Sequence, residues 1–188
     1  MEVQVELTGR TPLIMHNPRL ADPMDTFVKE IAKFSKKRTK TDDDHESIAR
    51  LEWHGGLYVH DGVVVLPLAN LRKCIIQAAR ASKQGKQIER SVFFREQTTK
   101  LIYQGPADFE SLYADGRFID RASVVVSSRR IIRVRPKFNA WQIRTDVVLN
   151  DALIDRDDFE RIITLAGQIE GLCDGRSMGY GRFDAELI

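Results

Sequence analysis

A run of basic residues in the second half of the chain has the charge and spacing to bind a phosphate backbone. Between Ser127 and Phe138 the sequence contains no acid and five cations: Arg129, Arg130, Arg133, Arg135 and Lys137. In an extended strand, alternate residues share one side at a spacing of about 6–7 Å, so Arg133, Arg135 and Lys137 are predicted to form a positive row. The planar guanidinium matches phosphate geometry, which favours contacts to a nucleic-acid backbone. The alternative is an edge strand that its charges protect against aggregation.

The glycine-rich stretch GLCDGRSMGYGRF, residues 171–183, is a second candidate phosphate site. A helix C-cap and a tight turn explain one or two of its glycines. They do not explain the others together with three side chains that can contact nucleic acid: Arg176, Tyr180 and Arg182. A loop that exposes backbone N–H groups between arginines can cradle phosphate, and Tyr180 is the aromatic most suited to stack on a base. The stretch has no P-loop lysine and enters a strand instead of following one, so we predict no nucleotide cofactor.

Residues suited to catalysis are sparse. The histidines are dispersed without an HExxH motif, and no serine stands in a GxSxG context. Cys74 and Cys173 lack metal-ligand spacing and are interpreted as structural thiols of a reducing compartment. Asp22 and Asp25, in RLADPMD, are the only candidates for a catalytic acid, and helix capping is the simpler explanation for an acid at that place. The sequence predicts no metal site.

The amino-acid composition indicates the broad class of protein. The chain has 188 residues, 43% of them hydrophobic, which is enough for a single domain with a real core. Charged residues make up 30% but the formal net charge is only +2, so attraction for a polyanion depends on how the cations are distributed. The beginning of the chain lacks the pattern of a signal peptide and no apolar run approaches about 18 residues, so we expect a cytoplasmic protein that does not bind membranes.

Hydrophobic periodicity predicts the elements that would position these residues. Strands are predicted at 2–8, in a hairpin at 57–67 around Asp61-Gly62, in a short hairpin at 92–103, in a long hairpin within 122–149, and after the glycine-rich stretch. Helices are predicted at 24–34, 43–53, 68–82 and 155–170. The loop between the first two helices carries Lys36, Lys37 and Arg38. It is either a solvated connection or a loop that grips a nucleic-acid strand. Without its insertions this order matches an α+β, ferredoxin-like antiparallel sheet with helices on one face.

Two motifs carry a resemblance to a known family. GRSMGYGRF before a final strand resembles the glycine-rich loop of the RAMP superfamily, the RRM-like proteins that include backbone subunits of CRISPR effector complexes. VLPLANLRKCIIQAAR is similar to the family's strand and Pro-Gly-Ser-Ser-Leu-Lys-Gly-type helix start, with Pro67, Leu71 and Arg72 at the matching positions. Leu68 and Ala69 depart from the family's Gly-Ser at this helix start. The opening LTGRTPLIM resembles the first strand and turn, whereas the insertions are unmatched.

The resemblance implies one RAMP-like palm domain over 1–188, with a helical insertion at about 22–55 and a thumb-like β-hairpin region at about 92–140. Arg72, the glycine-rich loop and the thumb would line a groove for single-stranded nucleic acid, along which copies of the protein polymerise. In overall character the chain also resembles short relatives in tailed phages. The preferred hypothesis is therefore a sequence-nonspecific, non-catalytic protein that coats single-stranded DNA in phage replication or recombination, in the host cytoplasm. The alternatives are a guide-RNA backbone subunit and a ribonuclease that uses Asp22 or Asp25.

Overall fold

The computed structural model describes residues 1–126 and 128–188, and it describes the side chains of neither Val126 nor Arg129. The chain divides into two compact units. Unit 1 consists of Met1–Leu13, Val59–Gln104 and Asn139–Ile188. Unit 2 consists of Ile14–Tyr58 and Gly105–Phe138. Both units are therefore assembled from segments that lie far apart in the sequence.

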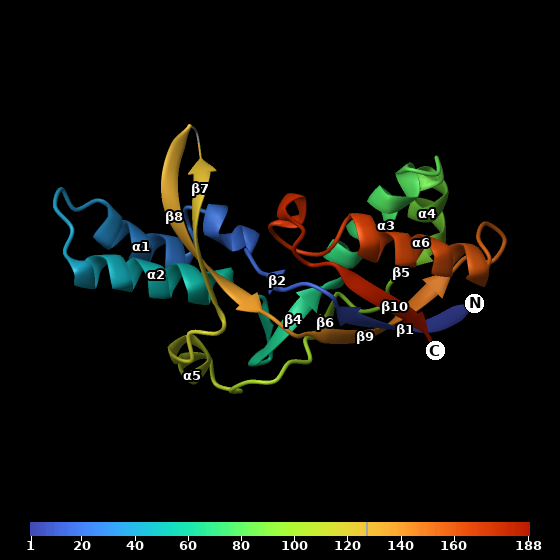
Figure 1. Ribbon diagram of the computed structural model, residues 1–188, viewed down its shortest axis with the longest axis horizontal. Coiled ribbons are helices and arrows are strands. Elements are labelled where there is room, and N and C mark those ends of the chain that lie inside the picture. Colours follow the sequence, from blue (N-terminus) through green and yellow to red (C-terminus); the bar gives the residue numbers. More distant parts are fainter. Residues whose placement is uncertain (127) are drawn as a thin grey trace. The chain divides into compact units, whose positions relative to one another are not determined.

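Unit 1 is built on a four-stranded antiparallel sheet in the order β10-β1-β9-β5. Its strands are β1 (Glu2–Gly9), β5 (Val92–Phe93), β9 (Gln142–Leu149) and β10 (Phe183–Leu187). The helices α3 (Leu68–Arg80) and α6 (Arg156–Ile169) pack against each other and cover one face of this sheet (Figure 1). The chain order β1-α3-β5-β9-α6-β10 with this strand order is the split βαβ plan, so the predicted ferredoxin-like fold is confirmed.

Alternating side chains explain how the sheet and its helices fit together. Val3, Val5 and Leu7 of β1 are buried under the helices, whereas the residues between them point to the other face. The apolar stripes of α3 and α6 supply the other half of this core. At Gly167 a Cβ atom would lie 2.1 Å from the carbonyl oxygen of Phe183, so α6 can approach β10 closely only with glycine at this position.

A second, smaller sheet in unit 1 has the order β3-β4-β6. It consists of β3 (Val59–His60), β4 (Val63–Pro67) and β6 (Thr98–Lys100). Asp61 and Gly62 join β3 to β4 with φ angles of 49° and 75°, which confirms the predicted hairpin turn. The predicted hairpin at 92–103 is wrong, because β5 pairs with β9 and β6 pairs with β4.

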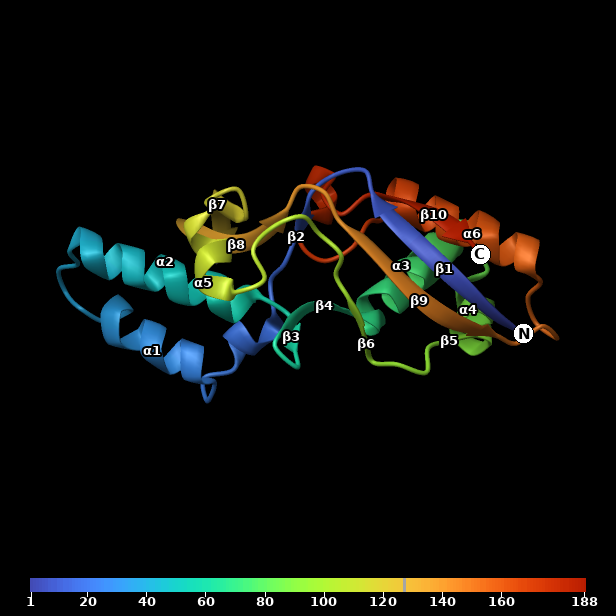
Figure 2. The same cartoon turned by 90° about the horizontal axis from the view of Figure 1, so that it is seen from below.

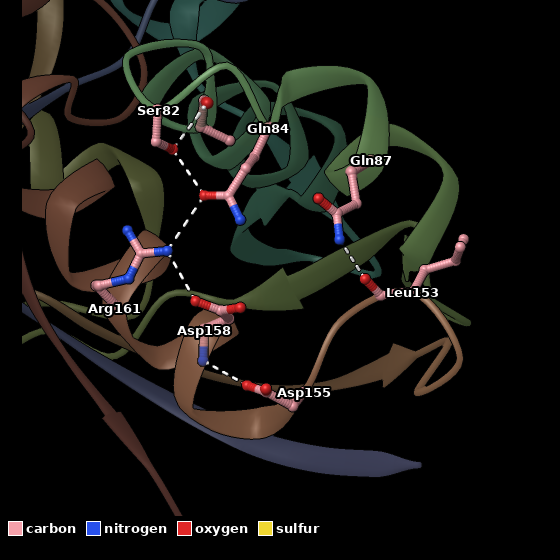
Figure 3. Close-up of polar contacts among 8 residues, drawn as sticks. Ser82, Gln84, Gln87, Leu153, Asp155, Asp158 and Arg161 are labelled. Atoms are coloured by element: carbon pink, nitrogen blue, oxygen red, sulfur yellow. Dashed lines mark hydrogen bonds and ion pairs between the residues drawn. The ribbon is translucent and has the colours of Figure 1, made fainter.

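Polar contacts fasten α4 (Gly85–Ser91) and the turn before it to α6 (Figure 3). The Gln84 side-chain oxygen accepts hydrogen bonds from Ser82 Oγ at 2.8 Å and Arg161 Nη2 at 3.1 Å. The same Arg161 nitrogen bonds Asp158 at 2.8 Å, and the Gln87 amide donates to the Leu153 carbonyl. Each polar group has a partner inside unit 1, which indicates a structural role.

Unit 2 combines helices with a long hairpin. Its helices are η1 (Pro18–Ala21), α1 (Thr26–Ser35), α2 (Asp42–Gly56) and α5 (Phe109–Ala114). Its strands are β7 (Ile119–Val126), β8 (Arg129–Phe138) and the end of β2 (Leu13–Ile14), in the order β2-β8-β7. Helices α1 and α2 lie side by side (Figures 1 and 2). Trp53 of α2 is fully buried and donates from Nε1 to the carbonyl of Phe118 at 2.8 Å.

The predicted long hairpin within 122–149 is wrong in its pairing. Strand β8 pairs with β7, in register from Ile119 opposite Pro136 to Val126 opposite Arg129, whereas β9 joins the sheet of unit 1. The turn includes Ser128 at a φ angle of 65°, so a break in the middle of one apparent strand makes the hairpin. Among the residues that the structure describes, we find no helix long and apolar enough to cross a bilayer.

A capping box at the beginning of α2 yields the first testable prediction. The Thr41 hydroxyl accepts from the Asp44 amide at 3.2 Å, and the Asp44 carboxylate accepts from the Thr41 amide at 3.1 Å. Thr41→Ala is expected to lower the free energy of unfolding by about 1 kcal/mol, measured by urea denaturation. The control Thr26→Ala, at the first residue of α1, should change it by less than about 0.5 kcal/mol. Equal losses of unfolding free energy in the two variants would show that the capping box does not stabilise the protein.

Candidate nucleic-acid interface

The glycine-rich loop folds tightly on itself. Four glycines of this loop have left-handed backbone conformations, with φ angles of 76° at Gly171, 70° at Gly175, 87° at Gly179 and 72° at Gly181. A Cβ atom on Gly181 would lie 2.1 Å from the Leu172 carbonyl oxygen, closer than any real contact. The short helix η2 (Arg176–Met178) lies between two of these glycines. The glycines are thus explained by the path of the backbone.

The loop uses most of its backbone N–H groups internally, which corrects the prediction that it exposes them to phosphate. Leu172 N donates to the Gly181 carbonyl at 2.9 Å, and Gly181 N donates to Pro12 at 2.9 Å. Five further amides donate to acceptors within unit 1: those of Gly175, Met178, Gly179, Tyr180 and Arg182. Amides already paired in this way gain little from an added phosphate.

The turn after β1 holds the loop in place. The Thr11 hydroxyl donates to the Gly179 carbonyl at 2.8 Å and accepts from the Arg182 amide at 2.9 Å. The Arg10 amide donates to the Arg182 carbonyl at 2.8 Å. These contacts join the first strand of unit 1 to its last one, so the side chains of the loop stand on a fixed backbone.

Two arginines of the loop have no carboxylate partner among the residues that the structure describes. Within the described parts of the chain, neither Arg176 nor Arg182 forms an ion pair. In the described part of the chain, Arg182 Nη2 makes only a long hydrogen bond of 3.4 Å to the Arg176 carbonyl, and its Nη1 is buried without an acceptor. A buried donor left unsatisfied costs free energy, so an anion that reoriented this guanidinium would gain a favourable contact.

Other side chains around the loop are structural. Burial raises the pKa of the Cys173 thiol to about 12, and Asn70 donates to its sulfur at 3.8 Å. Burial likewise raises the pKa of Cys74 to about 12, so both thiols stay protonated near neutral pH. The Tyr180 ring covers Gly175, where a Cβ atom would lie 2.7 Å from ring carbon Cδ2. Tyr180 is half-buried, so the predicted stacking on a base would have to use the part of its side chain that remains exposed.

The prediction of an exposed positive row on the basic strand is wrong. Arg135 is 5% exposed, and its Nη2 bonds Asp120 of the neighbouring strand at 2.6 Å. Arg133 Nη1 bonds Glu52 of α2 at 2.5 Å, and the second oxygen of Glu52 accepts from the Val134 amide at 3.1 Å. Glu52 lies 81 residues from Arg133, and Asp120 lies 15 residues before Arg135, so both carboxylates fall outside the basic run.

The remaining cations of the basic run are placed differently. Lys137 is half-buried and Arg130 is exposed, while the side chain of Arg129 lies outside the described residues. In the loop between α1 and α2, Lys37 pairs with Asp44 at 2.6 Å, and Lys36 and Arg38 are exposed. Unit 2 therefore neutralises several of the cations that we predicted to bind phosphate.

Arg72 makes structural contacts at the beginning of α3. Its Nη2 donates to the Glu89 carbonyl at 2.6 Å and its Nε donates to the Val92 carbonyl at 3.3 Å. Carbonyls near the end of α4 thus hold this guanidinium, which is a favourable position for a cation.

Asp22 and Asp25 form local hydrogen bonds that account for an acid at each position without a catalytic role. The Asp22 side chain accepts from the Met24 amide at 2.8 Å. Asp25 caps α1 by accepting from the Phe27 amide at 2.8 Å, and it accepts from Arg19 Nε at 2.8 Å. Desolvation raises the pKa of Asp25, but the bonds from Arg19 and Phe27 outweigh it and lower this pKa overall. Among the described residues, no group of three or more acids, histidines or cysteines could hold a metal ion.

The uncovered face of the large sheet is acidic, a feature that the sequence analysis missed. It presents Glu6 and Glu186 directly opposite each other, and three further acids: Glu2, Asp146 and Asp184. Glu6 pairs with Arg144, Arg95 with Glu2, and Arg10 with Asp184. RRM domains stack bases on aromatic residues of this face, and a surface of carboxylates disfavours that mode of binding here. The alternating acids in EVQVELT and FDAEL could have predicted this acidic face from the sequence.

Comparison with known proteins found no matching family model and no matching curated sequence. A chain of the type III-B Cmr-beta complex, solved by cryo-EM with cognate target RNA, resembles the structure with a TM-score of 0.49 and 12% identity. The match covers 100% of this chain and 60% of that one. The crystal structure of Cmr4 gives a TM-score of 0.42 and 9% identity, covering 100% of this chain and 98% of that one.

Proposed function

We propose that this protein binds single-stranded nucleic acid through its phosphates and that Arg176 and Arg182 are the central contacts. The observation that carries this proposal is the presence of two guanidiniums on a firmly anchored loop without a carboxylate partner in the described parts of the chain. Four of the other cations that we considered are compensated: Arg133, Arg135 and Lys37 by acids, and Arg72 by backbone carbonyls. A phosphate would supply the acceptors that the loop lacks.

The first form of the proposal is a non-catalytic protein that coats single-stranded DNA in a phage-type replication or recombination process. Contacts made mainly to phosphates would make it tolerant of sequence and allow copies to assemble along the strand. The resemblance of GRSMGYGRF to the RAMP glycine-rich loop favours a second form, a guide-RNA backbone subunit of a CRISPR-type complex. Asp22 and Asp25 have no catalytic role in either form.

The proposal is tested with the purified wild-type chain and fluorescein-labelled oligonucleotides of equal length. Fluorescence anisotropy is measured with single-stranded DNA, single-stranded RNA and duplex DNA over a series of salt concentrations. For two to four phosphate contacts, the logarithm of the affinity should fall against that of the salt concentration with a slope of about −1.4 to −2.8. Preference for DNA supports the coating protein, and preference for RNA supports the backbone subunit. No binding to any strand in dilute buffer would disprove the proposal.

A further inference from the structure

An apolar pocket of about 540 Å³ lies in unit 1 at the beginning of α3. Pro67 and Leu68 line it together with the aromatic residues Phe93 and Phe94. Its polar lining residues include Gln97 and Thr98 and one acid, Glu96. The lining thus combines aromatic and aliphatic surface with a few polar groups, which is typical of sites that bind small molecules.

Phe93 is the most unusual residue of this pocket. It is 47% exposed, and no other Phe, Tyr or Trp side chain in the described parts of the chain is as exposed. It lies in edge strand β5 opposite Val148, at the border of the acidic face of the large sheet. Leaving a phenyl ring in water forgoes the gain of burial, so a bound group would cover it favourably.

A basic groove continues from the pocket along α3. It has a volume of about 290 Å³ and shares Ala69 and Arg72 with the apolar pocket. Lys73 and Arg80 line it together with a single acid, Glu89. The beginning of α3 adds the partial positive charge of a helix N-terminus, although the Leu68 amide already donates to the Gln97 carbonyl at 2.9 Å. Anionic groups are therefore favoured next to the aromatic residues of the pocket.

We propose that this pocket binds a nucleobase of the bound strand, stacked on Phe93, while the adjoining phosphates follow the basic groove along α3. This inference rests on the proposed function and adds a base-contacting site to its phosphate contacts. A stacked base would cover the exposed ring of Phe93, and Gln97 and Thr98 could form hydrogen bonds with the edge of the base. The basic groove distinguishes a nucleotide from an apolar peptide, for which the cations would serve no purpose.

The test compares Phe93→Ala with the wild-type chain on two oligonucleotides of equal length, one with normal bases and one with abasic sugars. Loss of one stacked base should weaken binding to the normal oligonucleotide about 5- to 100-fold and leave binding to the abasic one unchanged. Phe93→Tyr should retain the wild-type affinity. Val63→Ala removes another exposed apolar side chain of unit 1, at 40% exposure, and should have no effect.

Photo-crosslinking of the wild-type chain to a 5-iodouracil oligonucleotide then locates the contact. Crosslinks at Phe93 or Phe94 support the pocket. If the wild-type chain binds but Phe93→Ala binds equally well and crosslinks fall elsewhere, the pocket proposal is overturned and the proposed function stands. If Phe93→Ala changes self-association in sedimentation but not oligonucleotide affinity, the pocket is a protein contact and the proposal fails. If the wild-type chain binds no oligonucleotide, both proposals fail.

Discussion

Asp120→Ala is expected to lower the free energy of unfolding by about 3–5 kcal/mol, because it removes one partner of a buried ion pair. Asp120 and Arg135 face each other across β7 and β8, and one carboxylate oxygen accepts from Nε at 2.9 Å and from Nη2 at 2.6 Å. The side chains are 12% and 6% exposed. After the change, the guanidinium would remain in the same place without this carboxylate, and water could reach it only poorly.

Urea denaturation followed by circular dichroism measures this loss, and hydrogen exchange should assign it to β7 and β8. Glu30→Ala is the matched control, since it removes an acid from the exposed pair with Lys33, whose side chains are 48% and 65% exposed. An exposed pair of this kind contributes at most about 1 kcal/mol. Similar losses for the two variants would mean that Arg135 does not depend on Asp120.

Arg176→Glu is expected to weaken binding to single-stranded nucleic acid by about 1.5–3 kcal/mol, or roughly 10- to 150-fold. The change removes a guanidinium that forms no ion pair in the described parts of the chain and puts a carboxylate beside the strand. Among the described residues, the Arg176 side chain makes no hydrogen bond to the loop backbone, so the loop should keep its fold. Anisotropy at one low salt concentration measures the effect.

The control for this prediction is Lys29→Glu, which makes the same change in net charge on α1 of unit 2, where Lys29 is exposed. It should bind as the wild-type chain does, apart from a small effect of overall charge. If both variants lost affinity equally, binding would depend on total charge instead of the glycine-rich loop.

Local patterns predicted most elements, because period-2 and helical spacing act over a few residues. The alternation in EVQVELT predicted β1, and Asp61-Gly62 predicted its hairpin turn. Strand pairing was predicted less well, since the partner of a strand depends on contacts far along the chain. The residues of β8 and β9 looked like one hairpin, but the two strands belong to different units.

The candidate site was only partly predicted, because its contacts also depend on residues that lie far apart in the sequence. The glycine-rich stretch stood out, but its glycines serve the backbone path, which sequence alone does not show. The charge of Arg133 is balanced by Glu52, 81 residues away, so the basic run gave no hint of its compensation. Phe93 was overlooked because VFF looks like an ordinary buried strand, and only the structure shows its ring exposed.

The most direct test of the account is the salt dependence of binding, measured side by side for the wild-type chain and Arg176→Glu on one single-stranded oligonucleotide. If Arg176 neutralises a phosphate, the variant should bind more weakly, and the magnitude of its log–log slope should be lower by about 0.7. If the two proteins gave the same affinity and the same slope, the glycine-rich loop would not be the place where the strand is held.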